Sequence, residues 1–286
     1  MFIPLTLLFL LPASAPHEPA EPPLERRWFP GGSLFEPLAA DLRWPHLGLG
    51  TEWYVGDRYL ESTYSVALGG TVPVWRSESG DVEWGLQGGV FSVFDRDQPS
   101  LDLFNSDYVG AAFVAGRFGE AKDMSYLVRV LHISTHVGDE YLINFPEVER
   151  ENFSFERADA FLSRDFDLGP LGPARGTELR VYGGLGAVIG EPEPADWGYL
   201  RAQWGSELRA DVFDGRGRLF LAADVQHEEA RDFVPDLSLS AGWELPTGRP
   251  GSAFRASIEY YVGREPNGQF WRDDVQIVGV GLSFTF

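Results

Sequence analysis

Four segments of this chain alternate between polar and apolar residues with a period of two. In residues 200–212, the side chains of Arg201, Glu207 and Arg209 fall on one face of an extended chain and mainly apolar side chains fall on the other. The same pattern recurs in residues 178–189, 236–245 and 254–263. The period predicts β-strands that each have one face in water and one face in an apolar medium.

The last residues of the chain distinguish a membrane barrel from a soluble β-sandwich. Apolar side chains share one face up to the end of the chain, at Val278, Val280, Leu282, Phe284 and Phe286. This arrangement resembles the C-terminal signal that outer-membrane barrels present to their assembly machinery. We therefore expect the barrel-assembly machinery to be a partner, through the strand that ends in Phe286.

The connections between the alternating segments predict a closed barrel. Short turns alternate with longer acidic loops, as in barrels with tight periplasmic turns and long external loops. The sequence therefore predicts an all-β fold, a transmembrane antiparallel β-barrel of about 12 strands over residues 46–286 in the outer membrane. We expect strands to begin near residues 47, 61, 82, 106, 124, 153, 178, 199, 218, 236, 254 and 274.

Composition narrows the classes of function. The mean hydropathy of −0.16 is too polar for a bundle of membrane helices, whereas a barrel accepts a polar residue at every second position. The formal net charge of −20 argues against nucleic acid as a partner, since phosphates need a basic face. The absence of cysteine excludes disulfides and thiolate metal sites.

The first 45 residues differ from the rest. Residues 2–11 are apolar and precede Pro12–Ala15, so residues 1–15 are predicted to be a signal peptide. Residues 16–45 are rich in proline and acidic residues, and we expect a periplasmic lead-in that folds back under the barrel.

Three stretches of the chain resemble a family of outer-membrane proteins to which no activity is assigned. They are Trp28–Pro30, Leu34–Pro45 and His132–Tyr141. The resemblance covers nearly the whole mature chain. It implies a barrel and export, and it brings no catalytic residues to this sequence.

The segment around His132 is the most unusual in chemical terms, because His132, Ser134 and His136 share one face of the predicted strand. Their direction depends on Arg129, which lies on the opposite face. A lipid-facing arginine near the midplane costs roughly 2–4 kcal/mol, so Arg129 should point into the lumen. His132 and Ser134 then face outward, near the extracellular rim.

An outward His-x-Ser pair resembles the pairs of outer-membrane phospholipase A and of lipid A deacylases. In those families histidine activates serine for attack on an acyl ester, and a third polar group orients the imidazole. The resemblance implies that His132 is the base and Ser134 the nucleophile. The orienting group would be Asn144, Asn152 or Glu156.

Two other interpretations of this segment remain open. The histidines can be polar rim residues that hold loops by hydrogen bonds. Alternatively, His136, Asp139 and Glu140 can bind a divalent cation, with calcium the candidate, because carboxylate oxygens and imidazole are suitable ligands. No other cofactor is expected.

The polar faces of the predicted strands carry charges of both signs. We expect a ladder of ion pairs inside the barrel that leaves at best a narrow pore, selective for cations. The sequence thus favours a structural barrel or a narrow passive pore. The alternative is a lipid-facing acyl hydrolase that acts on phospholipid or lipid A esters in outer-membrane lipid and lipopolysaccharide. The predicted lumen charges are Arg201, Glu207, Arg209, Asp211, Arg255 and Glu259.

Overall fold

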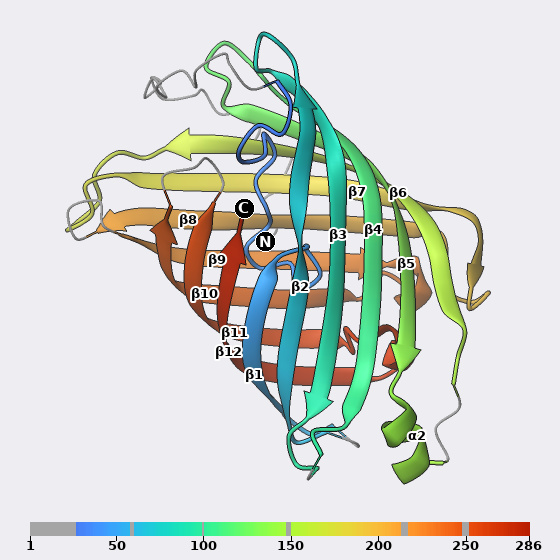
Figure 1. Ribbon diagram of the computed structural model, residues 1–286. Helices are drawn as coiled ribbons and strands as arrows, with labels where there is room; N and C mark the ends of the chain where they lie inside the picture. Colours follow the sequence, from blue (N-terminus) through green and yellow to red (C-terminus); the bar gives the residue numbers. More distant parts are fainter. Residues whose placement is uncertain (1–26, 58–59, 99, 147–149, 213–216, 248–251) are drawn as a thin grey trace.

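The computed structural model describes residues 27–286 except for 58–59, 99, 147–149, 213–216 and 248–251. The predicted signal peptide, residues 1–15, therefore lies outside the described residues. Within the described part, twelve antiparallel strands form one closed barrel (Figure 1). The strands are β1 (Leu47–Tyr54), β2 (Ser62–Arg76), β3 (Val82–Asp95), β4 (Leu103–Phe118), β5 (Met124–Val137), β6 (Phe153–Asp167), β7 (Thr177–Glu193), β8 (Leu200–Val212), β9 (Gly217–Glu228), β10 (Pro235–Pro246), β11 (Ala253–Arg264) and β12 (Asp274–Thr285).

The predicted barrel is confirmed. Neighbouring strands in the sequence pair with each other, and β1 closes the sheet by pairing with β12, with Leu47 opposite Phe284. The largest difference in a strand start is at β4, which begins at Leu103 rather than near 106. The reason is that Asn105 and Asp107 pair with β5 and point into the lumen, so these polar residues belong to a strand and not to a loop.

The barrel has two distinct ends. The short connections between β2 and β3 and between β4 and β5 lie at one end, here called the turn end. The other end, here called the loop end, carries a short helix α2 (Asp139–Asn144) and the 3-10 turns η2 (Glu229–Arg231) and η3 (Gly268–Phe270). Among the described residues, no helix is long and apolar enough to cross a membrane.

Exposed aromatic side chains mark two levels on the outer surface. Such paired rings are typical of the two interfaces of a bilayer, where an aromatic ring meets the headgroups. Apolar side chains such as Val128, Val130, Leu185 and Ile258 are exposed between them. The loop-end ring includes Trp53, Tyr64, Tyr108 and Tyr260, and the turn-end ring includes Trp84, Phe118, Trp243 and Phe254.

The lead-in lies inside the barrel, as Figure 1 shows for the dark blue segment. Trp28 forms a β-bridge with Trp75 near the turn end of β2. Further along, Phe35 and Trp44 are almost fully buried, with ring centroids 5.8 Å apart, and both pack against Phe161 of β6. Burial of a side chain of this size contributes roughly 1.5–3 kcal/mol. The described part of the lead-in therefore lies inside the lumen and does not fold under the barrel.

Candidate functional site on the outer face of the barrel

His132 and Glu156 face outward from neighbouring strands. His132 lies on β5 directly opposite Glu156 on β6, and residues opposite each other in an antiparallel pair are close enough to interact. His132 Nδ1 lies 3.0 Å from Glu156 Oε1. The side chains are 50% and 57% exposed, so the pair lies on the outer surface.

The carboxylate of Glu156 fixes the tautomer of the imidazole. An ionised carboxylate only accepts hydrogen bonds, so Nδ1 of His132 must carry the proton that it donates to Oε1. In the neutral ring, Nε2 is then without a proton and can accept one. A general base that takes a proton from a serine hydroxyl needs this tautomer.

Ser134 lies two residues further along β5 toward the loop end, on the same face as His132. Its side chain is half-buried, and it lies opposite Ser154 of β6 and Tyr108 of β4. Within the described chain, no hydrogen bond joins Ser134 to His132. Catalytic hydrogen bonds are often long before substrate binds, so this geometry is compatible with a serine and its base.

The site lies at the boundary between the apolar band and the loop end. Val128 and Val130, toward the turn end of the same face, are each 50% exposed. Tyr108, beside Ser134, belongs to the loop-end ring of aromatic side chains. Ser134 therefore lies at the level of the loop-end ring of aromatic side chains.

The three residues that the sequence offered as orienting groups lie in different places. Asn144 donates to Asp102 Oδ2 at 2.9 Å, away from the histidine. Asn152 donates to Glu193 on β7. Of the three, only Glu156 contacts the imidazole of His132.

The candidate metal ligands are not gathered around one point. His136 Nδ1 lies 3.2 Å from Arg150 Nη2, whereas Asp139 and Glu140 lie on the first turn of α2. In the part of the chain that the structure describes, no group of three or more histidine and carboxylate side chains is placed to hold a metal ion.

The charges predicted for the lumen make ion pairs of several kinds. Arg209 Nη2 lies 2.8 Å from Glu207 Oε2, and Arg201 Nε lies 3.1 Å from Glu228 Oε1. Of the other predicted lumen charges, Arg255 pairs with Glu244, whereas Glu259 makes no ion pair with the residues that the structure describes and accepts a hydrogen bond from Ser257. Asp211 pairs with Arg218 near the end of β8, and its side chain is 41% exposed and not buried in the lumen.

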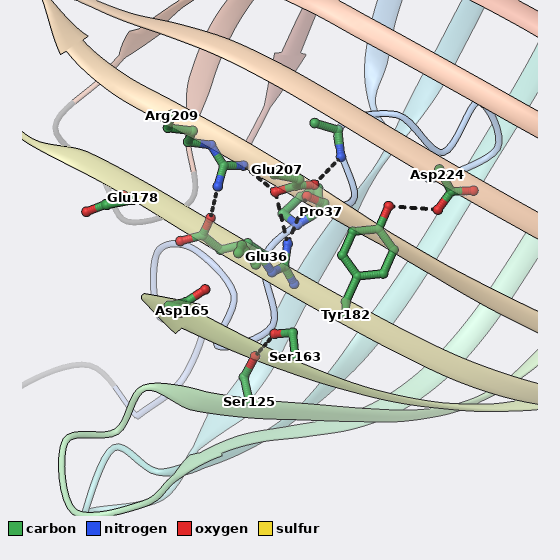
Figure 2. A network of polar contacts seen from close by, with 12 residues as sticks. Glu36, Pro37, Ser125, Ser163, Asp165, Glu178, Tyr182, Glu207, Arg209 and Asp224 are labelled. Carbon is green, nitrogen blue, oxygen red and sulfur yellow. Dashed lines mark hydrogen bonds and ion pairs between the residues drawn. The ribbon is translucent and has the colours of Figure 1, made fainter. Parts of the chain in front are cut away.

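The lead-in contributes polar residues that the sequence did not point to. Figure 2 shows Glu36 beside Arg209 and Glu207, with Tyr182 and Asp224 further along the lumen. Burial alone would raise the pKa of Glu36, but the guanidinium groups of Arg209, Arg180 and Arg117 outweigh it and hold that pKa at about 2. The negative charge of the acidic lead-in is complementary to the positive charge of the inward-facing arginines. This complementarity was the signal in the sequence that could have placed the lead-in inside the barrel.

At the other end of the lead-in, Asp41 and Arg43 reach the barrel wall. Asp41 Oδ2 accepts from Gln203 at 3.1 Å, and Arg43 pairs with Asp107 at 3.0 Å. Cavities remain on both sides of the lead-in, and Asp41 and Arg43 line both.

Outer-membrane phospholipases of known structure share this fold. Outer-membrane phospholipase A from Escherichia coli has a TM-score of 0.58 at 14% identity over 85% of this chain and 97% of its own. The calcium-bound dimer of the Salmonella typhi phospholipase has the same TM-score and identity, over 85% and 91%. LpxR from Salmonella typhimurium has a TM-score of 0.44 at 10% identity, over 84% and 99%.

At these identities the likeness shows the fold alone: the structural neighbours are outer-membrane β-barrels. No curated protein matches the chain. A family model described as "Protein of unknown function (DUF1207)" matches residues 20–286, and the chain therefore belongs to that family.

Proposed function

We propose that the protein is an outer-membrane acyl hydrolase that cleaves lipid esters at the outer face of its barrel. Ser134 is the nucleophile, His132 the general base and Glu156 the positioning residue. The observation that carries the proposal is the hydrogen bond from His132 Nδ1 to Glu156 Oε1 on a face that also presents Ser134.

The chemistry follows from the tautomer of His132. Nε2 takes the proton of Ser134 as Oγ attacks the ester carbonyl carbon, and the carboxylate of Glu156 stabilises the imidazolium that forms. Collapse of the tetrahedral intermediate expels the alcohol, which receives the proton from Nε2. A water molecule, activated by the same base, then releases the fatty acid from the serine ester.

The position of the site suits a lipid substrate. Acyl ester groups of bilayer lipids lie between the headgroups and the chains, at the level that Tyr108 and the other rings of the loop end mark. Polar side chains on a lipid-facing surface are costly toward the midplane and much less so near an interface. A pair such as His132 and Glu156 is therefore tolerated at this level.

The fold and the lumen also support the proposal. The phospholipases named above have a barrel of the same fold and are named for the hydrolysis of phospholipid. The lumen of this chain holds the buried lead-in, with Phe35 and Trp44 packed against the wall. A lumen that the lead-in occupies in this way favours chemistry on the outer face over passive conduction.

The experiment is the release of fatty acid from mixed micelles of ester lipids by the refolded barrel. Ser134→Ala and His132→Ala should each lose the activity while remaining folded. Ser206→Ala is a matched control, since Ser206 lies on the outward-facing side of β8, away from β5. Equal background release from the wild type and from the Ser134 and His132 variants would contradict the proposal.

A second readout does not depend on the choice of lipid. A fluorophosphonate, which reacts with activated serines, should label the wild type at Ser134, and His132→Ala should prevent the labelling. Labelling at Ser134 that persists without His132 would show that the histidine does not activate the serine.

A further inference from the structure

The polar face of β5 continues beyond the serine. His136 lies two residues past Ser134, on the same face and toward the loop end. Arg150, from the connection between β5 and β6, reaches it, with Nη2 3.2 Å from His136 Nδ1. Both residues are exposed, and the ring of Tyr108 packs edge-on against the imidazole with centroids 5.6 Å apart.

This contact leaves hydrogen-bond donors without an acceptor. Arginine has only donors, so Nδ1 of His136 must be the acceptor, and in the neutral ring Nε2 then carries the proton. The remaining N–H groups of Arg150 and the Nε2–H of His136 can serve one ligand together. A ligand with several acceptor oxygens and a negative charge fits these donors best.

Two other arginines at the loop end, Arg272 and Arg231, are held by carboxylates. Arg272 lies 2.6 Å from Glu151 Oε2 and 2.9 Å from Asp196 Oδ2, and Arg231 pairs with Asp274. Among the described residues, no carboxylate is paired with Arg150. Arg150 contacts His136, two residues from Ser134 on the same face of β5, and in a chain with a net charge of −20 it can attract an anionic ligand.

We propose that His136 and Arg150 bind the phosphate of the substrate, and that the substrate is a glycerophospholipid. The inference rests on the proposed function, because it places the phosphate relative to Ser134. Two residues of a strand span roughly 7 Å. The glycerol unit separates an acyl ester from the phosphate by a comparable distance, so one lipid molecule can reach both the serine and the arginine.

The orientation agrees with the bilayer. The phosphate lies nearer to water than the ester, and His136 and Arg150 lie nearer to the loop end than Ser134. An acyl chain would then run toward the turn end, over the exposed side chains of Val130 and Val128. Headgroup, ester and chain thus follow one line along β5.

The test compares two substrates that carry the same acyl ester. One is phosphatidylglycerol, and the other is the corresponding diacylglycerol, which has no phosphate. Arg150→Gln should raise KM for the phospholipid about tenfold, because one charge-assisted hydrogen bond to the phosphate is lost. Hydrolysis of the diacylglycerol should be unchanged. Arg150→Lys should restore part of the difference, and Arg231→Gln, a loop-end arginine held by Asp274, is the matched control.

Binding gives a readout that needs no turnover. In Ser134→Ala barrels, a dialkyl ether analogue of phosphatidylglycerol should bind about tenfold more weakly when Arg150→Gln is added. Inorganic phosphate should not compete at millimolar concentration if the lipid as a whole is recognised. Competition at that level would mean that the pair binds free phosphate, and it would overturn the assignment to a lipid headgroup.

The remaining outcomes separate the two proposals. A wild type that cleaves neither ester removes the hydrolase, and the inference with it. A wild type that cleaves both, with an Arg150→Gln variant that changes both equally or neither, overturns the inference and leaves the hydrolase standing. A strong preference for lipid A that depends on Arg150 would also overturn it, because the phosphate would come from a different lipid.

Discussion

Arg129 Nη2 and Asp159 Oδ2 lie 2.9 Å apart inside the barrel, and this ion pair determines which way the candidate site faces. Arg129 is three residues before His132 on β5, and an odd separation along a strand places two side chains on opposite faces. Because Arg129 is buried in the lumen, His132 and Ser134 point outward.

Replacement of Arg129 by leucine should destabilise the barrel. The change removes the bond to Asp159, the bond to Gln87 and the contact with the ring of Trp44. Asp159 keeps its bond to Arg157, so the expected loss is that of a charged hydrogen bond, about 1.5–3 kcal/mol. Urea unfolding in lipid vesicles measures the loss of unfolding free energy. Arg218→Leu is the control, since Arg218 is partly exposed and its ion pair should contribute less than about 1 kcal/mol. A loss below about 0.5 kcal/mol would mean that the pair does not hold this face of β5.

The barrel was predictable because each strand repeats one simple rule. Residues 200–212 alternate between the lumen and the outer surface as the sequence indicated, and the C-terminal strand ends in the predicted apolar face. The direction of His132 also followed, because the cost of placing Arg129 in lipid decides between the two faces.

The position of the lead-in was not predictable in the same way. Residues 28–46 form no regular alternation, and their contacts are with strands far away in the sequence, such as the bond from Ala39 N to Glu207. Likewise, Glu156 could not be preferred over Asn144 or Asn152 as the partner of His132. That choice depends on the register of β5 against β6, which spacing alone does not fix across a long loop.

Glu156→Gln tests the positioning residue. The amide oxygen can still accept from Nδ1, but it carries no charge to stabilise the imidazolium. We expect kcat for lipid ester hydrolysis to fall at least about a hundredfold while KM stays unchanged. Glu156→Asp should recover part of kcat. An effect on KM alone, or equal loss in the glutamine and aspartate variants, would show a merely structural role.

The lead-in should seal the lumen. Trp44 is 2% exposed and packs on Phe35 and Phe161, so Trp44→Ala should cost about 3–5 kcal/mol in urea unfolding. Trp28→Ala is the matched control, since Trp28 is 61% exposed.

Deletion of residues 28–44 should join the two cavities that Asp41 and Arg43 now separate. Planar bilayers should then show larger conductance steps than the wild type, and identical traces would mean that the lead-in does not close the barrel.

Glu265 should make the stability of the loop end depend on pH. It lies between β11 and η3, is 2% exposed, and its Oε2 has no hydrogen-bond partner in the described structure. Burial raises the pKa of Glu265 to about 8, although the N–H groups of Asn267 oppose the shift; Asp57 adds to it and Arg43 opposes it. Because the folded-state pKa lies above the unfolded value of 4.5, the protonated form favours folding. This contribution is fully present below about pH 4.5 and is lost as the pH rises toward 8.

Glu265→Gln mimics the protonated acid and removes this dependence. The variant and the wild type should have similar unfolding free energies near pH 4.5, and the variant should be more stable by a few kcal/mol at pH 9, at about 1.4 kcal/mol per unit of pKa shift. Urea unfolding in vesicles across this pH range measures the difference in unfolding free energy between the variant and the wild type. Contributions from other titrating groups, such as His46, are the same in both proteins and cancel. Glu140→Gln, on the exposed side of α2, is the control and should show no such trend. If the difference in unfolding free energy between the variant and the wild type stays constant from pH 4.5 to 9, Glu265 is ionised in the folded barrel throughout. Its charge would then be compensated by Arg43, whose guanidinium also donates to Pro266 and Asn267.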